Sequence, residues 1–235
     1  MGVREHSAAA ADARAHIAGL GREPLAPLPE GFAAGRDVLH RVAEETLQIR
    51  GRAQRGAGWL RPYTPGGIGS PAWDVGAESG LPGSIRVEGA ELVTVTGAEE
   101  EREPIDVDPA VTAALADFYA LTTAALDDLI EAGGDADADP IRLWPEHFDA
   151  ATTIGDEAAG TRANYGGSPG DENHPEPYLY VGPWTEQPEG EIWNATGFHG
   201  AELGYAELLA AGDQLAAARS FFGRHLQLLR SGAGG

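Results

Sequence analysis

The chain has 235 residues and a formal net charge of −21, with 37 acidic residues against 16 basic residues, all of which are arginine. The absence of cysteine excludes disulfides and thiolate metal sites, and the absence of lysine excludes a Schiff base and a Walker-type phosphate loop. An acidic surface repels nucleic acid and anionic membranes, so we expect neither as a partner. We also expect no signal peptide and no membrane span, and therefore a cytoplasmic location.

The predicted elements begin after an Ala- and Pro-rich N-terminal arm over residues 1–35. A helix is expected from Asp37, as its cap, to about Arg50. A hairpin is expected over residues 84–96, because two β-branched arms flank the turn Gly89-Ala90. A two-residue turn that begins with glycine favours type II′.

The second half of the chain combines one long helix with several strands. The long helix is predicted between Pro109 and Gly133, with Asp108 as its cap. Residues 155–177 contain five glycines without periodicity and are expected to form an ordered loop. Strands are expected over residues 142–144, 148–154, 178–181 and 191–194, and helices over 201–211 and 213–230. This order predicts an α+β fold, a mainly antiparallel sheet packed with helices, in one domain over residues 36–231.

Two His-x-acid pairs are the first candidate chemistry. His147 and Asp149 form one pair, and His174 and Glu176 form the other. On an extended segment residues i and i+2 project to the same side, so each pair presents an imidazole beside a carboxylate. This arrangement suits a divalent metal or a base oriented by an acid, with His199 as a third imidazole. No established zinc spacing is present, so a purely structural role remains the alternative.

Aromatic residues gather in the same region, where nine of the 17 lie between Trp144 and Tyr205. Aromatic faces near carboxylates suit a small cationic or planar ligand. The alternative is that every second aromatic residue of a strand fills the core. The candidate ligand-binding residues are Trp144, Tyr165, Tyr178, Tyr180 and Trp193.

An acidic segment resembles a calcium-binding loop of the EF-hand type. Asp135, Asp137, Asp139 and Glu146 occupy the first, third, fifth and twelfth positions of such a loop, but Pro140 stands where the loop requires glycine. A solvated acidic turn explains the same residues.

Four motifs resemble those of a known group of sequences: LWPEHFD at 143–149, NYGGSPGD at 164–171, EPYLYVGPW at 176–184 and WNATGF at 193–198. With them, the chain from about His40 to Phe222 is similar to a family of uncharacterised actinobacterial proteins. The element order is also similar to a larger bacterial family of unknown function that has F-D-L-A and P-E-P segments. The resemblance implies a soluble, single-domain bacterial protein and supplies no activity, cofactor or catalytic residue.

These observations leave three hypotheses of function. The first is a small-molecule-binding protein, with a metal-assisted enzyme as one form of it, whose site lies where residues 144–149, 155–177 and 193–199 converge. The second is a non-catalytic acidic protein that binds a basic partner or a second copy of itself as a homodimer. The third is a calcium-stabilised structural domain.

Overall fold

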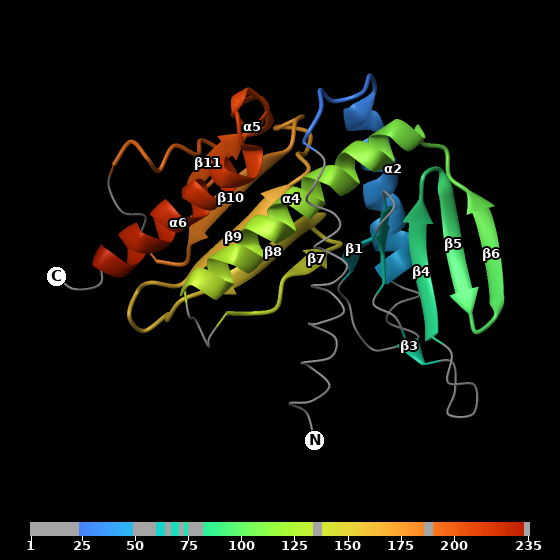
Figure 1. Cartoon of the computed structure of the whole chain (residues 1–235), viewed down its shortest axis with the longest axis horizontal. Coiled ribbons are helices and arrows are strands. Elements are labelled where there is room, and N and C mark those ends of the chain that lie inside the picture. Colours follow the sequence, from blue (N-terminus) through green and yellow to red (C-terminus); the bar gives the residue numbers. More distant parts are fainter. Residues whose placement is uncertain are drawn as a thin grey trace.

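The computed structural model shows an α+β domain with two antiparallel sheets, which confirms the predicted fold class (Figure 1). The structure describes residues 24–48, 60–63, 67–70, 73–74, 82–133, 138–185 and 190–232. The helices are α2 (Phe32–Val42), the π-helical segment η1 (Ala43–Gln48), α4 (Pro109–Gly133), α5 (Tyr205–Ala210) and α6 (Gln214–Gly232). The strands of the first sheet are β1 (Arg61–Tyr63), β2 (Gly67–Gly69), β3 (Trp73–Asp74), β4 (Pro82–Glu88), β5 (Glu91–Thr96) and β6 (Glu99–Pro104). Those of the second sheet are β7 (Arg142–Trp144), β8 (Asp149–Ile154), β9 (Ala163–Ser168), β10 (Tyr178–Pro183) and β11 (Ala201–Gly204).

The second sheet has five strands in the order β11-β10-β9-β8-β7, all antiparallel. Its β7 edge continues into the first sheet, because Leu60 and Leu143 exchange two backbone hydrogen bonds of 2.8 and 3.0 Å. At the β11 edge the Asn194 side chain accepts the N–H of Glu202 at 2.9 Å and donates to its carbonyl oxygen at 3.1 Å. Each edge of this sheet is therefore paired, one by backbone and one by a side-chain amide.

One face of the five-stranded sheet forms the core with α4 and α6, which lie together across it (Figure 1). Side chains alternate between the two faces of a strand, so the inward residues share one parity. They are Leu143, Ala150, Ile154, Tyr165, Leu179 and Val181, all buried. The opposite face of this sheet carries no helix in the part of the chain that the structure describes.

The long helix α4 begins and ends as the sequence predicts. Asp108 accepts the N–H of Ala110 at 2.8 Å, and Pro109 is the first helical residue. The helix is long and apolar enough to cross a membrane by length and composition, yet 67% of its most apolar window is buried inside the domain. Its apolar character is therefore accounted for by the core that it fills.

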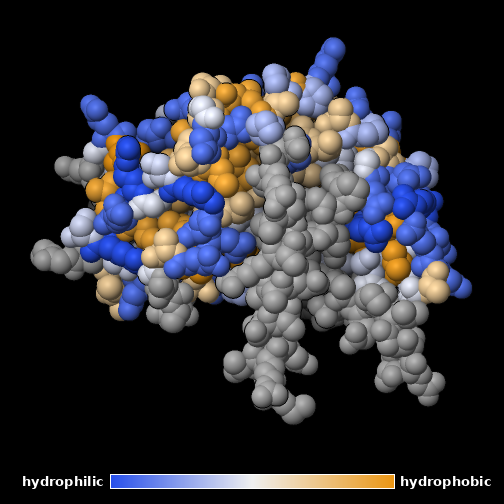
Figure 2. Space-filling model, in the orientation of Figure 1, coloured by the Kyte–Doolittle hydropathy of each residue, from blue (hydrophilic) through white to orange (hydrophobic). Residues whose placement is uncertain are grey.

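The hairpin of β4 and β5 is confirmed, with Glu88 paired to Glu91 across the turn. Gly89 has a φ of 59° whereas Ala90 is not among the residues with positive φ, as a type II′ turn requires. The sequence did not predict β6, in which every residue is exposed. At this end of the molecule hydrophilic residues predominate (Figure 2).

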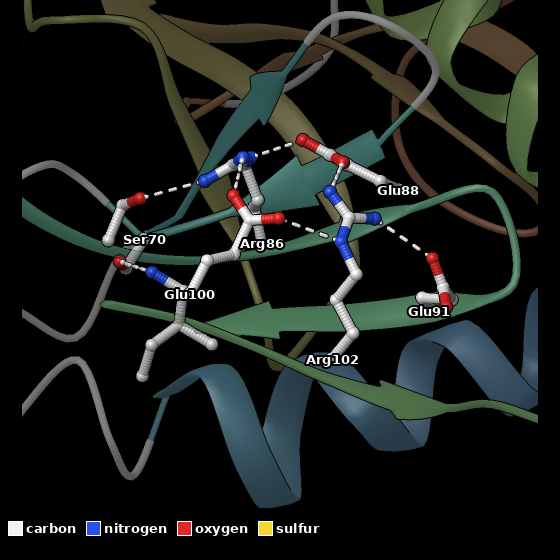
Figure 3. Close-up of polar contacts among 8 residues, drawn as sticks. Ser70, Arg86, Glu88, Glu91, Glu100 and Arg102 are labelled. Carbon is white, nitrogen blue, oxygen red and sulfur yellow. Dashed lines mark hydrogen bonds and ion pairs between the residues drawn. The ribbon is translucent and has the colours of Figure 1, made fainter. Parts of the chain in front are cut away.

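Charged side chains form a network over β4, β5 and β6 (Figure 3). Arg102 donates to Glu88, Glu91 and Glu100 at 2.9, 2.9 and 2.7 Å, and Arg86 donates to Glu88 at 2.6 Å. In the register, Val93 lies between these two arginines and is fully buried. The arginine stems therefore cover an apolar residue on this face of the sheet.

Residues 24–35 of the predicted N-terminal arm pack against the domain. Leu25 and Phe32 are buried, and the backbone N–H and carbonyl of Leu25 both bond the side-chain amide of Gln214. The following helix begins at Phe32 and not at Asp37, whose carboxylate accepts hydrogen bonds from Arg36 instead. Residues 1–23 lie outside the described part of the chain.

Three further predictions of secondary structure are wrong, wholly or in part. The segment 155–177 contains the central strand β9, and residues 191–194 form turns and irregular backbone. The predicted helix over 201–211 is the short strand β11 followed by α5. The remaining predicted strands and the last helix are confirmed within a few residues.

Candidate functional site

An open cleft of about 700 Å³ lies on the face of the five-stranded sheet opposite α4 and α6. It is lined by the outward residues of four strands and by their loops. The strand residues are Arg142, Trp144, Asp149, Ala151, Thr153, Asn164, Ser168, Tyr178, Tyr180 and Gly182. They have the parity opposite to that of the core residues, so the cleft and the core are the two faces of one sheet. Thr152 of β8 also lines the cleft, although it has the parity of the core residues.

Small residues occupy the middle of one row across the face of the sheet that carries the cleft. The register places Arg142, Ala151, Gly166 and Tyr180 side by side on neighbouring strands. The Tyr180 ring lies over Gly166, where a Cβ atom would be 2.8 Å from both Cζ and Oη of the tyrosine. Gly166 therefore permits Tyr180 to lie flat and to reach toward Asp149.

Asp149 is the central charged residue of the cleft. It is only 8% exposed, and its Oδ2 atom accepts a hydrogen bond from the Tyr180 hydroxyl. No donor among the described residues reaches its buried Oδ1 atom. Burial, and to a smaller extent the charge of Glu146, raises the pKa of the Asp149 carboxyl above its usual value, and the hydrogen bond from Tyr180, the charge of His147 and the backbone N–H of Asp149 itself oppose this shift. Burial and the negative charge of Asp149 raise the pKa of Tyr180 as well, so the tyrosine remains a donor.

The hairpin that carries Asp149 is held in an uncommon backbone conformation. Phe148, the residue before it, has a φ of 54°, in the left-handed region that disfavours residues with a Cβ atom. Its ring is buried, with the ring of His40 stacked at 5.0 Å and that of Tyr119 edge-on at 5.9 Å. The Tyr119 hydroxyl donates to the carbonyl oxygen of Phe148. Packing against α2 and α4 therefore holds the conformation that positions Asp149.

A single face of α2 supports two loops beside the cleft. His40 Nε2 donates to the Pro145 carbonyl oxygen at 2.9 Å, and Arg36 donates to the Pro175 carbonyl oxygen at 3.1 Å. Residues four apart on a helix are neighbours on its surface, so one helical turn contacts both loops. Within the second loop, Asp171 accepts the N–H groups of residues 173 and 174 at 2.7 and 2.9 Å.

Aromatic rings form one side of the cleft. Tyr178, Tyr180 and Phe198 have ring centroids 6.1 to 6.5 Å apart. His174 stacks on Tyr178, with the ring centroids 4.2 Å apart. Burial raises the pKa of Tyr178, although its hydrogen bond with Ser168 opposes the shift. On another strand, Trp144 is 37% exposed and carries the Arg142 guanidinium 5.6 Å from its ring centroid.

The charged residues of the cleft are mostly acidic. Four carboxylates line it, together with one guanidinium and one imidazole. The residues are Asp139, Glu146, Asp149, Asp171, Arg142 and His147. Of these, Asp139 also forms an ion pair of 3.3 Å with Arg162. Several like charges around a concave surface attract ligands of the opposite sign, in this case cations.

The structure does not bring the predicted metal residues together. His147 and Asp149 line the cleft, whereas His174 packs behind Tyr178, and Glu176 and His199 are exposed residues that do not line it. Among the described residues, no three His, Asp or Glu side chains are grouped closely enough to hold a metal ion. The i, i+2 spacing aligns the members of one pair, but it does not decide whether two pairs share a site.

Three of the five predicted ligand-binding residues, Trp144, Tyr178 and Tyr180, line the cleft. The structure places Tyr165 and Trp193 outside the cleft, buried on the opposite side of the sheet. The Tyr165 ring packs edge-on against Phe222 of α6, and the Trp193 ring packs edge-on against His225 of the same helix. Both residues agree with the alternative interpretation, in which some of the aromatic residues fill the core.

Sequence reasoning missed several residues of the cleft, among them Arg142, Asn164 and Phe198. Strand parity would have identified Arg142, which lies two residues before Trp144 on β7. Asn164 belongs to a strand that was not predicted. The predicted calcium loop is only partly described, because Asp135 and Asp137 lie outside the described residues. Of its other members, Asp139 pairs with Arg162 and Glu146 lies in the loop between β7 and β8.

Comparisons with protein-family models, with curated proteins and with solved structures give no match to this chain. The similarity to an actinobacterial family therefore stays a prediction. Any functional conclusion rests on the cleft itself.

Proposed function

We propose that this protein binds a small organic molecule in the cleft on the outer face of the five-stranded sheet. The observation that carries the proposal is a concave surface that combines aromatic rings with a buried, partly unpaired carboxylate. Ligand sites are typically clefts of about 300–1,000 Å³ with apolar walls and a few positioned polar groups, and the cleft of about 700 Å³ has these properties. Its aromatic side favours a ligand with a planar or apolar portion.

The positioning of the cleft residues also supports a binding role. Asp149 follows a residue in a left-handed conformation, and the carbonyl groups of the adjoining loops are held by Arg36 and His40. Residues held in unfavourable conformations are concentrated at functional sites, where the surrounding packing maintains them. A site that is formed before the ligand arrives loses less conformational entropy on binding.

The second hypothesis, an acidic interaction protein, predicted a large exposed apolar patch with an acidic rim. Among the described residues, only Trp144, Trp184 and Leu228 are large, apolar and exposed. Trp144 is on β7 and is part of the cleft, Trp184 follows β10, and Leu228 is on α6. The small-molecule hypothesis therefore has the stronger structural support.

A side chain introduced at Gly182 tests the proposal. Gly182 lines the cleft, and a Cβ atom at this position would meet no other atom within 4 Å. Gly182→Leu should fill the cleft without disturbing the fold. Gly223→Leu is the matched control, because Gly223 has the same open space but lies on α6.

The experiment is a screen of a small-molecule library against the full chain by ligand-observed NMR. The wild type and the Gly223→Leu variant should bind a common set of compounds, and Gly182→Leu should lose them. Equal binding to all three proteins, or no binding to the wild type, would contradict the proposed function.

A further inference from the structure

The chemistry of the unpaired oxygen of Asp149 narrows the class of ligand, provided that the cleft is a ligand site as proposed above. Asp149 is more than nine-tenths buried and lines the cleft. One carboxylate oxygen is satisfied by the Tyr180 hydroxyl, and the other, Oδ1, is covered from solvent and has no donor among the described residues. A buried acceptor of this kind is unfavourable until a donor reaches it.

Three classes of ligand group can be compared at this oxygen. An anionic group would be repelled by Asp149 and by the other carboxylates of the cleft. A quaternary ammonium could lie against the aromatic rings but has no hydrogen to donate, so it would leave the oxygen unsatisfied. A neutral hydroxyl could donate a hydrogen bond but would leave the buried charge without a counterion.

A protonated nitrogen that bears hydrogen meets both requirements at once. It neutralises the buried charge and donates to the free acceptor, and hydrogen bonds between charged groups are the stronger kind. The rings of Tyr178, Tyr180 and Phe198 would interact favourably with such a cation. Burial, which raises the pKa of Asp149, is partly compensated when a positive charge lies beside the carboxylate.

We propose that the ligand of this cleft carries a protonated N–H group, an ammonium, amidinium or guanidinium, and that this group binds to the Asp149 carboxylate, whose rotation brings Oδ1 to the cleft. The rest of the ligand lies along the aromatic side of the cleft. Asp149 is thus the residue that selects cations, and Tyr180 is the positioning residue that fixes the carboxylate.

The test uses probes that share one frame and differ only in the head group. On the phenethyl frame these are phenethylamine, phenethyl alcohol, phenylacetate and N,N,N-trimethylphenethylammonium, and matched sets are made on the benzyl and butyl frames. Affinities for the full chain are measured by protein-observed NMR. In at least one set the N–H cation should bind roughly 10 to 100-fold more tightly than its alcohol, anion and trimethyl counterparts.

Two isosteric variants complete the test. Asp149→Asn should reduce the affinity for the N–H cation by about 10-fold or more, since the charge and one acceptor are lost. Asp128→Asn makes the same chemical change on α4, where Asp128 pairs with Arg219, and should change the affinity by less than about twofold. A carboxyl-selective NMR titration should also show that the bound amine lowers the pKa of Asp149.

The inference is overturned if no N–H cation binds, or if the alcohol or trimethyl probe binds as tightly as the amine. Failure of this inference is distinguishable from failure of the proposed function. If compounds no longer bind to Gly182→Leu but bind normally to Asp149→Asn, the cleft is still supported as a binding site and the N–H requirement is rejected. If neither variant changes the binding of any compound, both the proposed function and the N–H requirement are rejected.

Discussion

Tyr180→Phe removes a single oxygen atom, which is the donor that holds the buried carboxylate of Asp149. The ring keeps its volume and its position over Gly166, so packing changes little. A hydrogen bond to a charged group contributes roughly 1.5–3 kcal/mol to stability, against about 1 kcal/mol for a neutral pair. We therefore expect a loss of about 1.5–3 kcal/mol at neutral pH. For a domain of this size each kcal/mol corresponds to about 2–4 °C in Tm.

The loss of stability caused by Tyr180→Phe should increase as the pH rises. Burial raises the pKa of Asp149 in the folded state, so its contribution to stability is present at low pH and declines as pH rises through that folded pKa. Tyr180 limits the decline, because its hydrogen bond favours the charged form. The difference between wild type and Tyr180→Phe should thus be smallest in acid, where Asp149 is protonated, and should grow toward neutral pH.

Urea unfolding, measured in steps between about pH 4 and pH 7, provides the assay. Tyr178→Phe is the matched control, since the Tyr178 hydroxyl pairs with the uncharged Ser168 on a neighbouring strand. The control should cost about 1 kcal/mol with little pH dependence over this range. In an Asp149→Asn background the cost of Tyr180→Phe should fall by about 1 kcal/mol. The same cost in both backgrounds, or a cost that is flat with pH, would refute the proposed role of the pair.

Three further predictions concern the fold that supports the cleft. Gly167→Ala should destabilise the protein by roughly 1–3 kcal/mol, because the new Cβ would lie 2.5 Å from Thr122 Oγ1; a normal urea midpoint would contradict this packing. Asp108→Ala should cost about 1 kcal/mol through loss of the α4 cap, and Asp108→Asn should recover most of it in the same assay. Asn194→Ala should speed hydrogen exchange at the Glu202 amide with only a small change in global stability; unchanged exchange would show that this edge does not need the side chain.

The elements that were predicted correctly are those whose local sequence signals agree with the contacts that the elements make in the fold. The helix from Pro109 has a cap, a proline at its first position and a terminal glycine, and the hairpin of β4 and β5 has glycine at the position that its turn requires. In both cases a few adjacent residues determine the structure. The α+β class followed from the order of such elements.

Two strands, β6 and β9, were not predicted from the sequence, for opposite physical reasons. The β9 strand contains Gly166 and Gly167, which weaken a strand signal, yet each is required by a close contact, one with Tyr180 and one with α4. The β6 strand consists almost entirely of charged residues, because it is an exposed edge. Neither requirement is visible until the neighbouring element is known.

The candidate site was predicted in part because strand parity is a local property. Tyr178 and Tyr180 share one face of β10, as alternation requires. Which face meets the helices and which lines the cleft depends on α4 and α6, so the roles of Tyr165 and Trp193 could not be assigned. The importance of Asp149 also depends on its burial and on its contact with a tyrosine 31 residues away.

The contacts of α2 with the two loops have a consequence for how the protein opens. Arg36 and His40 release the loops at Pro175 and Pro145 together if this helix detaches. Partial unfolding at the N-terminal side would then abolish ligand binding while the five-stranded sheet remains intact, because such local openings require less free energy than global unfolding. By linkage, a ligand bound in the cleft would stabilise the attachment of α2 to the domain. Ligand binding would then slow amide hydrogen exchange in α2, although this helix lies outside the cleft.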